Sequence, residues 1–141
     1  GYFFDLNLYE KYYKKMQTPY TPSIPHLFGL NEVLNIIELE GLENRWNRHK
    51  EMRDYVIDWA KGNGQNLFSE DGCHSYTVTC IENSKKWDVN KIYDKLLNLG
   101  YRMDRGYGDL RCKAFRIPHM GNIQMQDLKE YINILDELIH V

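Results

Sequence analysis

The sequence lacks the features of a membrane protein or a nucleic-acid binder. No apolar run approaches the roughly 20 residues that a helix needs to cross a bilayer, so we expect no membrane partner. The formal net charge is −2 and the pI is about 6.2, which gives no overall attraction to nucleic acid or to an anionic surface. We therefore expect a function that involves neither partner.

Paired cysteines and metal-ligand clusters are also missing. The three cysteines, Cys73, Cys80 and Cys112, are odd in number and form no CxxC pair, so neither a disulfide framework nor a zinc site is predicted. None of the five histidines lies at metal-ligand spacing from another. We predict no bound metal and, from the cysteine usage, a reducing cytoplasm.

A glycine-rich phosphate loop of recognised form is absent as well. Gly106 and Gly108 begin a possible GxGxxG motif, but its last position is Arg111. Any contact with phosphate must therefore come from another kind of segment.

The 141 residues have the composition of an ordinary globular domain, with 43% hydrophobic and 27% charged residues. We interpret residues 1–24 as an arm with a proline-stiffened connector, and residues 25–141 as a single domain. The opening stretch GYFFDLNLYEKYYKK has neither an initiator Met nor a signal-peptide core, which we interpret as a cut into a longer chain.

The hydrophobic spacing changes between helical and strand periods along the chain. Leu27, Leu30, Leu34 and Ile37 mark one face of a helix, and Asp88 is placed as the N-cap of another. Helices are predicted over residues 6–15, 26–40, 42–61, 89–99 and 124–139, and strands over 75–81, 101–106 and 113–118.

This order predicts an α+β fold. After the arm it runs helix, helix, strand, helix, strand, strand, helix, which is typical of a small, mostly antiparallel sheet of three or four strands covered by helices. His49 falls on the inner face of the second helix and Cys80 on a core strand, so we expect both to be buried.

Arg116 is the first candidate for a binding residue. In a strand, Phe115 and Ile117 point to one face and Arg116 to the other. The guanidinium either pairs with a structural carboxylate or holds an exchangeable anion. Two neighbouring stretches favour the anion: RGYG at 105–108, whose glycines permit a close backbone approach, and MGN at 120–122, which could line a cleft.

Thr18, Thr21 and His119 are further candidates. The threonines lie in TPYTPSIP just before a helix, where hydroxyl and N–H groups suit phosphate, although capping threonines in a linker have the same pattern. His119 follows the arginine strand and either supports the site from behind or only completes the fold.

Three stretches together resemble a known family. TPYTPSIPHLFGL, EGLENRWNRHKEM and GYGDLRCKAFRIPHMGN are similar to the C-terminal part of the class V, fold-type I aminotransferases that use pyridoxal 5′-phosphate. The closest group is the serine–pyruvate and alanine–glyoxylate aminotransferases. The resemblance extends over nearly the whole chain and keeps the motif order. It implies transfer of an amino group from alanine, serine or aspartate to glyoxylate or pyruvate.

The resemblance also implies roles for particular residues. Arg116 occupies the position that grips the α-carboxylate of the amino acid. Thr21, and less closely Thr18, match an arm that touches the phosphate of the partner subunit's cofactor in a homodimer. Pro118 departs from the family's usual glycine, which could shift the strand end and with it His119.

The resemblance leaves the catalytic lysine unaccounted for. No lysine here lies in the family's Schiff-base context, so we expect no catalytic residue in this chain, no cofactor bound to it in isolation and no activity of this part alone. The lysine is expected upstream, in a large cofactor-binding domain.

Two alternatives remain open at this stage. One is a stand-alone, non-enzymatic module that binds an amino acid or another anion. The other keeps the fold but changes the reaction, to a pyridoxal-phosphate lyase or a cysteine desulfurase. Cys73 is the only candidate for a desulfurase thiol, and its acidic surroundings disfavour that role.

Overall fold

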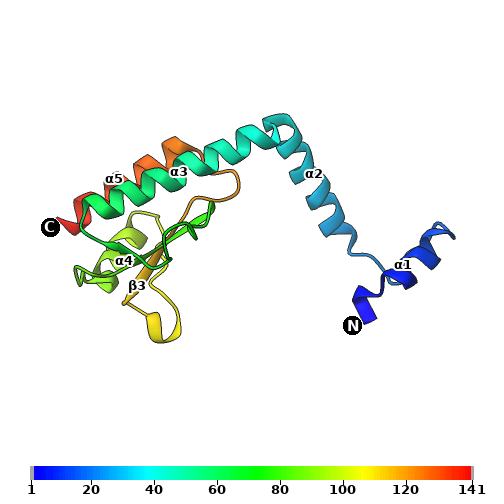
Figure 1. Cartoon of the computed structure of the whole chain (residues 1–141), viewed down its shortest axis with the longest axis horizontal. Coiled ribbons are helices and arrows are strands. Elements are labelled where there is room, and N and C mark those ends of the chain that lie inside the picture. The colour runs from blue at the N-terminus through cyan, green and yellow to red at the C-terminus, as the bar shows by residue number, and fades with distance from the viewer. Residues whose placement is uncertain (1, 141) are drawn as a thin grey trace. The chain divides into compact units, whose positions relative to one another are not determined.

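The computed structural model describes residues 2–140 and divides the chain into two compact units, one extending to Leu42 and one beginning at Glu43. Figure 1 labels the main elements. Their order is η1 (Tyr2–Phe4), α1 (Leu6–Tyr13), α2 (Ile24–Glu40), α3 (Leu42–Gly62), β1 (Asn66–Leu67), β2 (Val78–Glu82), α4 (Val89–Asn98), η2 (Gly108–Leu110), β3 (Ala114–Pro118) and α5 (Met125–Ile139). Within residues 2–140, no helix combines the length and apolar character of a bilayer-spanning segment.

Local capping explains where the helices of the first unit begin and end. The Asp5 carboxylate accepts hydrogen bonds from the N–H groups of Asn7 at 3.1 Å and Leu8 at 3.3 Å, which starts α1. Pro25 lies in the first turn of α2, where its missing N–H costs nothing. Gly41, with φ of 82°, ends that helix.

The apolar face predicted for α2 is present but remains uncovered within the first unit. Leu27, Leu30 and Leu34 are each about half exposed, and Phe28 and Leu39 are more exposed still. No residue of α1 or α2 is buried. The first unit therefore presents an uncovered row of apolar side chains along α2.

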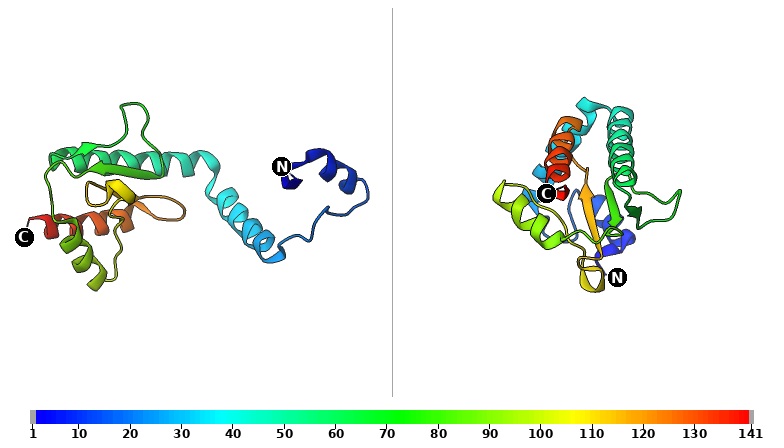
Figure 2. Two further views of the ribbon diagram at one scale, coloured as in Figure 1. Left: turned by 90° about the horizontal axis from the view of Figure 1, so that it is seen from below. Right: turned by 90° about the vertical axis from the view of Figure 1, so that its left-hand side faces the viewer.

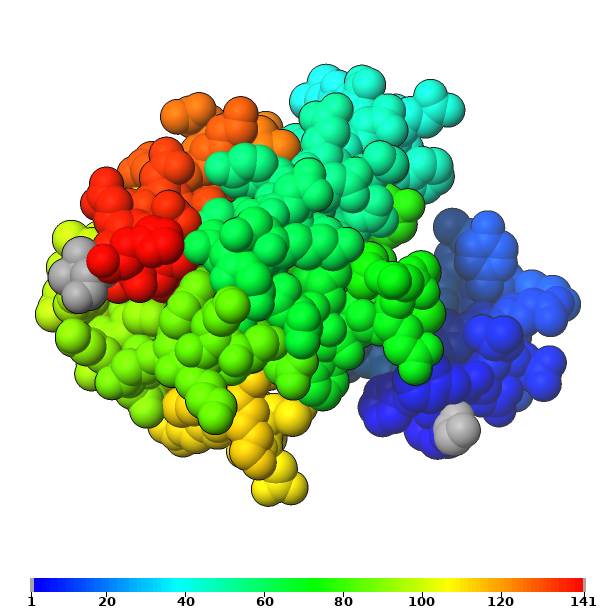
Figure 3. All heavy atoms as spheres, turned by 60° about the vertical axis from the view of Figure 1, so that its left-hand side comes forward, coloured from blue at the N-terminus to red at the C-terminus, as the bar shows by residue number. Residues whose placement is uncertain are grey.

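The second unit contains a continuous core. It is built by α3, α4 and α5 against one face of the sheet, and their atoms form an unbroken surface in the space-filling view (Figure 3). The core residues are Met52, Val56 and Ala60 from α3, Ile81 from β2, Val89, Ile92 and Leu96 from α4, Met103 from the segment that follows α4, Phe115 and Ile117 from β3, and Leu128, Ile132 and Leu135 from α5.

The sheet is antiparallel, with the strand order β1-β2-β3 (Figure 2). In the central register Cys80 lies opposite Arg116, and Ile81 lies opposite Phe115. The predicted α+β class, with a small antiparallel sheet covered by helices, is confirmed.

Some details differ from the prediction. The expected strand over 101–106 is reduced to a single bridge, between Asp104 and Arg116. The short strand β1 was not predicted. Cys80 is only partly buried, because the helices cover the opposite face of β2, where Thr79 and Ile81 lie. The first turns of α3 extend past the core, which leaves Leu42 and Trp46 exposed.

Candidate functional site

Alternation along β3 places Arg116 on the open face of the sheet. Phe115 and Ile117 are fully buried, whereas the Arg116 side chain is 47% exposed. Val78 and Cys80 of β2 lie on the same open side. We call this surface, defined by Val78, Cys80 and Arg116, the open sheet face. The predicted separation of the arginine from its neighbours is confirmed.

The Arg116 guanidinium forms a two-pronged ion pair with Asp104. Nε–H donates to Oδ1 at 2.9 Å, and an Nη2 hydrogen donates to Oδ2 at 2.6 Å. The hydrogen bond from Arg116 lowers the pKa of the Asp104 carboxyl, assisted by the Gly106 N–H and opposed by partial burial. A carboxylate of the chain itself therefore occupies one edge of the arginine.

The segment that carries Asp104 is held by its own contacts. Arg105 donates to the side chain of Asn90 at 2.8 Å, and its guanidinium lies 3.9 Å from the ring centre of Tyr93. The N–H of Cys112 donates to the carbonyl of Arg105 at 2.7 Å. Contacts to α4 and to the end of the loop thus hold Arg105, which lies between Asp104 and Gly106.

The glycines of RGYG have a structural role that differs from the predicted close approach to a ligand. The φ of Gly106 is 76°, and an added Cβ would lie 2.3 Å from the carbonyl oxygen of Leu110 and 2.7 Å from that of Ala114. The close approach is therefore to the chain's own backbone. Gly108 has open space around the corresponding position.

The MGN segment beyond β3 is tied to α3 by two arginines. Arg45 and Arg48 both donate to the carbonyl of Gly121, at 3.0 Å and 3.1 Å. Arg48 also donates to the carbonyl of Ile123. These bonds hold the loop that follows the arginine strand against the first half of α3.

His119 is buried behind the strand end, and its ring is fully hydrogen-bonded. Its Nδ1 lies 3.1 Å from the carbonyl of Tyr76, and its Nε2 lies 2.9 Å from the hydroxyl of Thr79. A carbonyl only accepts, so Nδ1 carries the proton and Nε2 accepts from Thr79. Burial lowers the pKa of His119, which therefore remains neutral at pH 7. Its role is to join the end of β3 to the start of β2.

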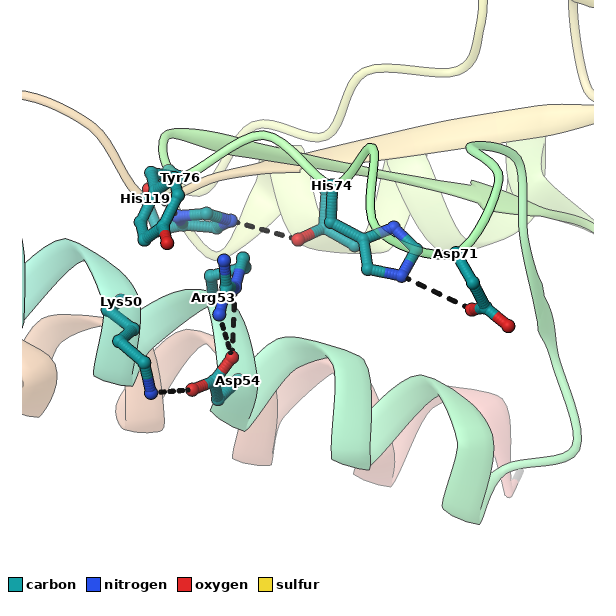
Figure 4. A network of polar contacts seen from close by, with 8 residues as sticks. Lys50, Arg53, Asp54, Asp71, His74, Tyr76 and His119 are labelled. Atoms are coloured by element: carbon teal, nitrogen blue, oxygen red, sulfur yellow. Dashed lines mark hydrogen bonds and ion pairs between the residues drawn. The ribbon is translucent and has the colours of Figure 1, made fainter.

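Three charged side chains of α3 form a network beside this histidine (Figure 4). The Arg53 guanidinium stacks on the ring of Tyr76 at 4.3 Å and pairs with Asp54 at 2.7 Å. Lys50 donates to the other oxygen of Asp54 at 2.9 Å. Hydrogen bonds from Lys50, and then from Arg53, lower the pKa of Asp54 against partial burial. Two cations of α3 thus share one carboxylate, and the three side chains keep a net charge of one positive unit.

Thr18 and Thr21 belong to the first unit, and Arg116 belongs to the second. The Thr18 hydroxyl donates to the carbonyl of Tyr20 at 2.7 Å, so its hydrogen is already used within the connector. Thr21 is exposed, and its hydroxyl has no partner among residues 2–140. Of the two threonines, Thr21 is the one whose donor remains available.

The residues present suit a supporting role around a pyridoxal phosphate cofactor. Lys95 is partly buried, and the other lysines are exposed, so none of them lies in an enclosed pocket. Attachment of the cofactor aldehyde requires a lysine in such a pocket. The exposed Thr21 hydroxyl suits a phosphate, and Arg116 suits a carboxylate. Among residues 2–140, each unit therefore offers one side chain whose chemistry suits an anion, and no lysine lies in an enclosed pocket.

Asp104 is the site residue that sequence reasoning missed. The one available signal was the predicted strand over 101–106, which lay next to the arginine strand in sequence. That signal did not give the register, and so it did not identify the partner of Arg116.

Comparisons with known proteins agree with this description. No protein-family model matches the chain. An uncharacterized aminotransferase of Methanocaldococcus jannaschii is 36% identical over 123 residues, covering 86% of this chain and 32% of that protein. The serine–glyoxylate aminotransferase of Arabidopsis thaliana is 37% identical over 131 residues, covering 86% and 31%.

A solved structure shows the same fold. The crystal structure of ureidoglycine–glyoxylate aminotransferase from Bacillus subtilis matches with a TM-score of 0.82 and 27% identity. The match covers 99% of this chain and 37% of that one. The chain thus spans about a third of the length of the curated relatives it matches.

Proposed function

Because this chain belongs to the class V aminotransferases and has the fold of their C-terminal domain, we propose that it is the C-terminal domain of a complete aminotransferase. In this proposal the domain comprises residues 25–141, and residues 1–24 form an arm. The enzyme moves an amino group from alanine, serine or aspartate to glyoxylate or pyruvate. Both the Arabidopsis relative and the Bacillus structure are named for reactions with glyoxylate, which supports that acceptor.

Arg116 is proposed to bind the α-carboxylate of the amino acid and of the 2-oxo acid. The supporting observation is its place on the open sheet face, where the side chain is 47% exposed and keeps N–H donors that Asp104 does not use. A forked guanidinium fixes both oxygens of a carboxylate and so sets the orientation of the Cα–H bond. Its contribution is positioning, with no proton transferred.

Pyridoxal phosphate, when bound, supplies the electron sink that makes bond cleavage at Cα possible. Thr21 is proposed to donate to the phosphate of the partner subunit's cofactor in a homodimer, and Thr18 to assist from the same arm. The lysine that attaches the cofactor lies outside residues 1–141 in this proposal. The chain alone is therefore expected to bind no cofactor and to have no activity.

Two variants of the complete enzyme test these roles against each other. Arg116→Ala is expected to raise KM for the amino donor by about 10- to 100-fold while the cofactor stays bound, because charge-assisted hydrogen bonds are lost. Thr21→Val is expected to weaken cofactor retention with a smaller effect on KM. Steady-state kinetics and the absorbance of bound cofactor after dialysis separate the two effects.

Two results would contradict the proposal. An unchanged KM for Arg116→Ala would reduce the arginine to a structural partner of Asp104. A complete protein that transfers no amino group to any of the named acceptors would favour a binding module instead.

A further inference from the structure

Asp104 and Arg116 are joined through backbone and side chain at once. The Arg116 N–H donates to the carbonyl of Asp104 at 3.3 Å, which forms the bridge between the two segments. The side chains add the two-pronged pair described above. Oδ1 of Asp104 also accepts the N–H of Gly106 at 2.9 Å. The carboxylate is therefore fixed by its own loop before it meets the arginine.

The pair occupies only one edge of the guanidinium. Asp104 takes Nε–H and one hydrogen of Nη2, which leaves Nη1 and the second hydrogen of Nη2. These remaining donors form another planar edge of the kind that matches a carboxylate. Among residues 2–140, Asp104 is the only acceptor that the Arg116 side chain contacts.

A free arginine side chain has many rotamers, and holding it in one of them has an entropic cost. The contact with Asp104 restricts the guanidinium to one plane, so this cost is met during folding and not when the ligand binds. The surroundings allow such fixing: β3 is anchored through Phe115 and Ile117, and the Asp104 segment through Arg105. The side chains of the pair remain accessible, at 47% for Arg116 and 39% for Asp104.

We propose that Asp104 is a positioning residue, which holds the Nε edge of Arg116 so that the Nη1–Nη2 edge faces the carboxylate of the substrate. This inference rests on the proposed function, because it presumes that Arg116 binds that carboxylate. The α-carboxylate of the substrate then approaches in the guanidinium plane, from the open sheet face. Asp104 touches Arg116 and not the reacting atoms.

The test uses substitutions at Asp104 in the complete enzyme with its cofactor. Asp104→Ala is expected to raise KM about tenfold for both the amino donor and the 2-oxo acid, with a smaller change in kcat, since a misplaced contact weakens the grip. Asp104→Asn retains an oxygen for Nε–H and for Gly106, so its KM is expected to lie between those of Asp104→Ala and the unchanged enzyme. Asp109→Asn is the matched control, an exposed carboxylate of the same loop, and should leave KM unaltered.

A second measurement reports the geometry without activity. In the 141-residue chain, the NMR signal of Arg116 Nε–H should exchange slowly with solvent, and it should exchange faster in Asp104→Ala and in Asp104→Asn. Circular dichroism of each variant shows whether it has folded. If Asp104→Ala fails to fold, Asp104→Asn alone decides through its KM.

The outcomes separate this inference from the function on which it rests. If Arg116→Ala raises KM but the folded Asp104 variants do not, the positioning role is wrong and the proposed function stands. If an Asp104 variant lowers KM, Asp104 competes with substrate for the arginine, and the inference is again overturned. If the unchanged enzyme transfers no amino group, both the proposed function and the positioning role of Asp104 are wrong.

Discussion

His119 is expected to make the stability of the second unit depend on pH. The ring has no exposed surface and donates to Tyr76 while it accepts from Thr79. Protonating Nε2 would turn an acceptor into a donor facing the Thr79 hydroxyl, and it would place a charge in a buried site. Burial accordingly lowers the pKa of His119 from its usual value of 6.5.

The direction of the pH effect follows from this pKa. In the unfolded chain the histidine takes up a proton as the pH falls through about 6.5, whereas in the folded chain it does so only at lower pH. The unfolded state then binds more protons, so the stability present above that pH is lost as the pH falls toward the folded pKa. Asp54 and Asp104 also have lowered pKa values, from 3.8, so the stability that they contribute begins to be lost only near that pH, well below 6.5.

His119→Gln removes the titration and disturbs the two hydrogen bonds. We expect it to cost about 1–3 kcal/mol at pH 7.5, which corresponds to a fall of roughly 3 to 12 °C in Tm. Thermal unfolding, followed by circular dichroism at several values between about pH 7.5 and about pH 5, gives the change of Tm with pH. The variant should be less stable than the unchanged chain at neutral pH. Its Tm should fall less than that of the unchanged chain when the pH is lowered.

The control is His140→Gln, at a histidine whose side chain is 66% exposed. This variant should have the same Tm as the unchanged chain at neutral pH, and its Tm should change with pH to the same extent. If the Tm of His119→Gln changes with pH as much as that of the unchanged chain, then His119 is not the group that titrates and the assignment of its neutral form is wrong.

Two further predictions concern the packing of the second unit. Gly106→Ala should destabilise it by about 2–4 kcal/mol, because the new Cβ would overlap the carbonyls of Leu110 and Ala114 at a positive φ. Gly72→Ala, at φ of 82° in open space, should cost only about 1 kcal/mol, and equal effects on Tm would contradict the argument. Tyr131→Phe should leave stability unchanged or raise it by about 1 kcal/mol, because the buried hydroxyl has no hydrogen-bond partner among residues 2–140 and burial raises its pKa to about 12. A clear loss of Tm in Tyr131→Phe would show that the hydroxyl has a partner after all.

Local patterns were sufficient to predict most of the second unit. Asp88 caps α4 as predicted, by accepting from the N–H of Lys91 at 3.0 Å, and His49 is buried on the inner face of α3. Both features depend on residues within a few positions of one another, which a linear sequence displays directly. The alternation around Arg116 has the same local origin.

Features that depend on distant segments were not predictable in this way. Whether Cys80 or Thr79 faces the core depends on which side of the sheet the helices cover, and alternation alone does not state the side. The pairing of Asp104 with Arg116 needs the register across a loop, which Gly106 and the left-handed Cys112, with φ of 62°, determine. The sequence showed neither conformation.

The one-sided covering of the sheet also bears on how such a domain changes over evolutionary time. Phe115 and Ile117 belong to the core, whereas Arg116 and Cys80 contribute little to it. Under the proposed function, mutations on the two sides of β3 are subject to different selection: one side for folding and the other for binding of the substrate. A lineage can exchange residues beside the arginine without first finding compensating changes among the helices, so new substrate preferences can arise while the scaffold remains the same.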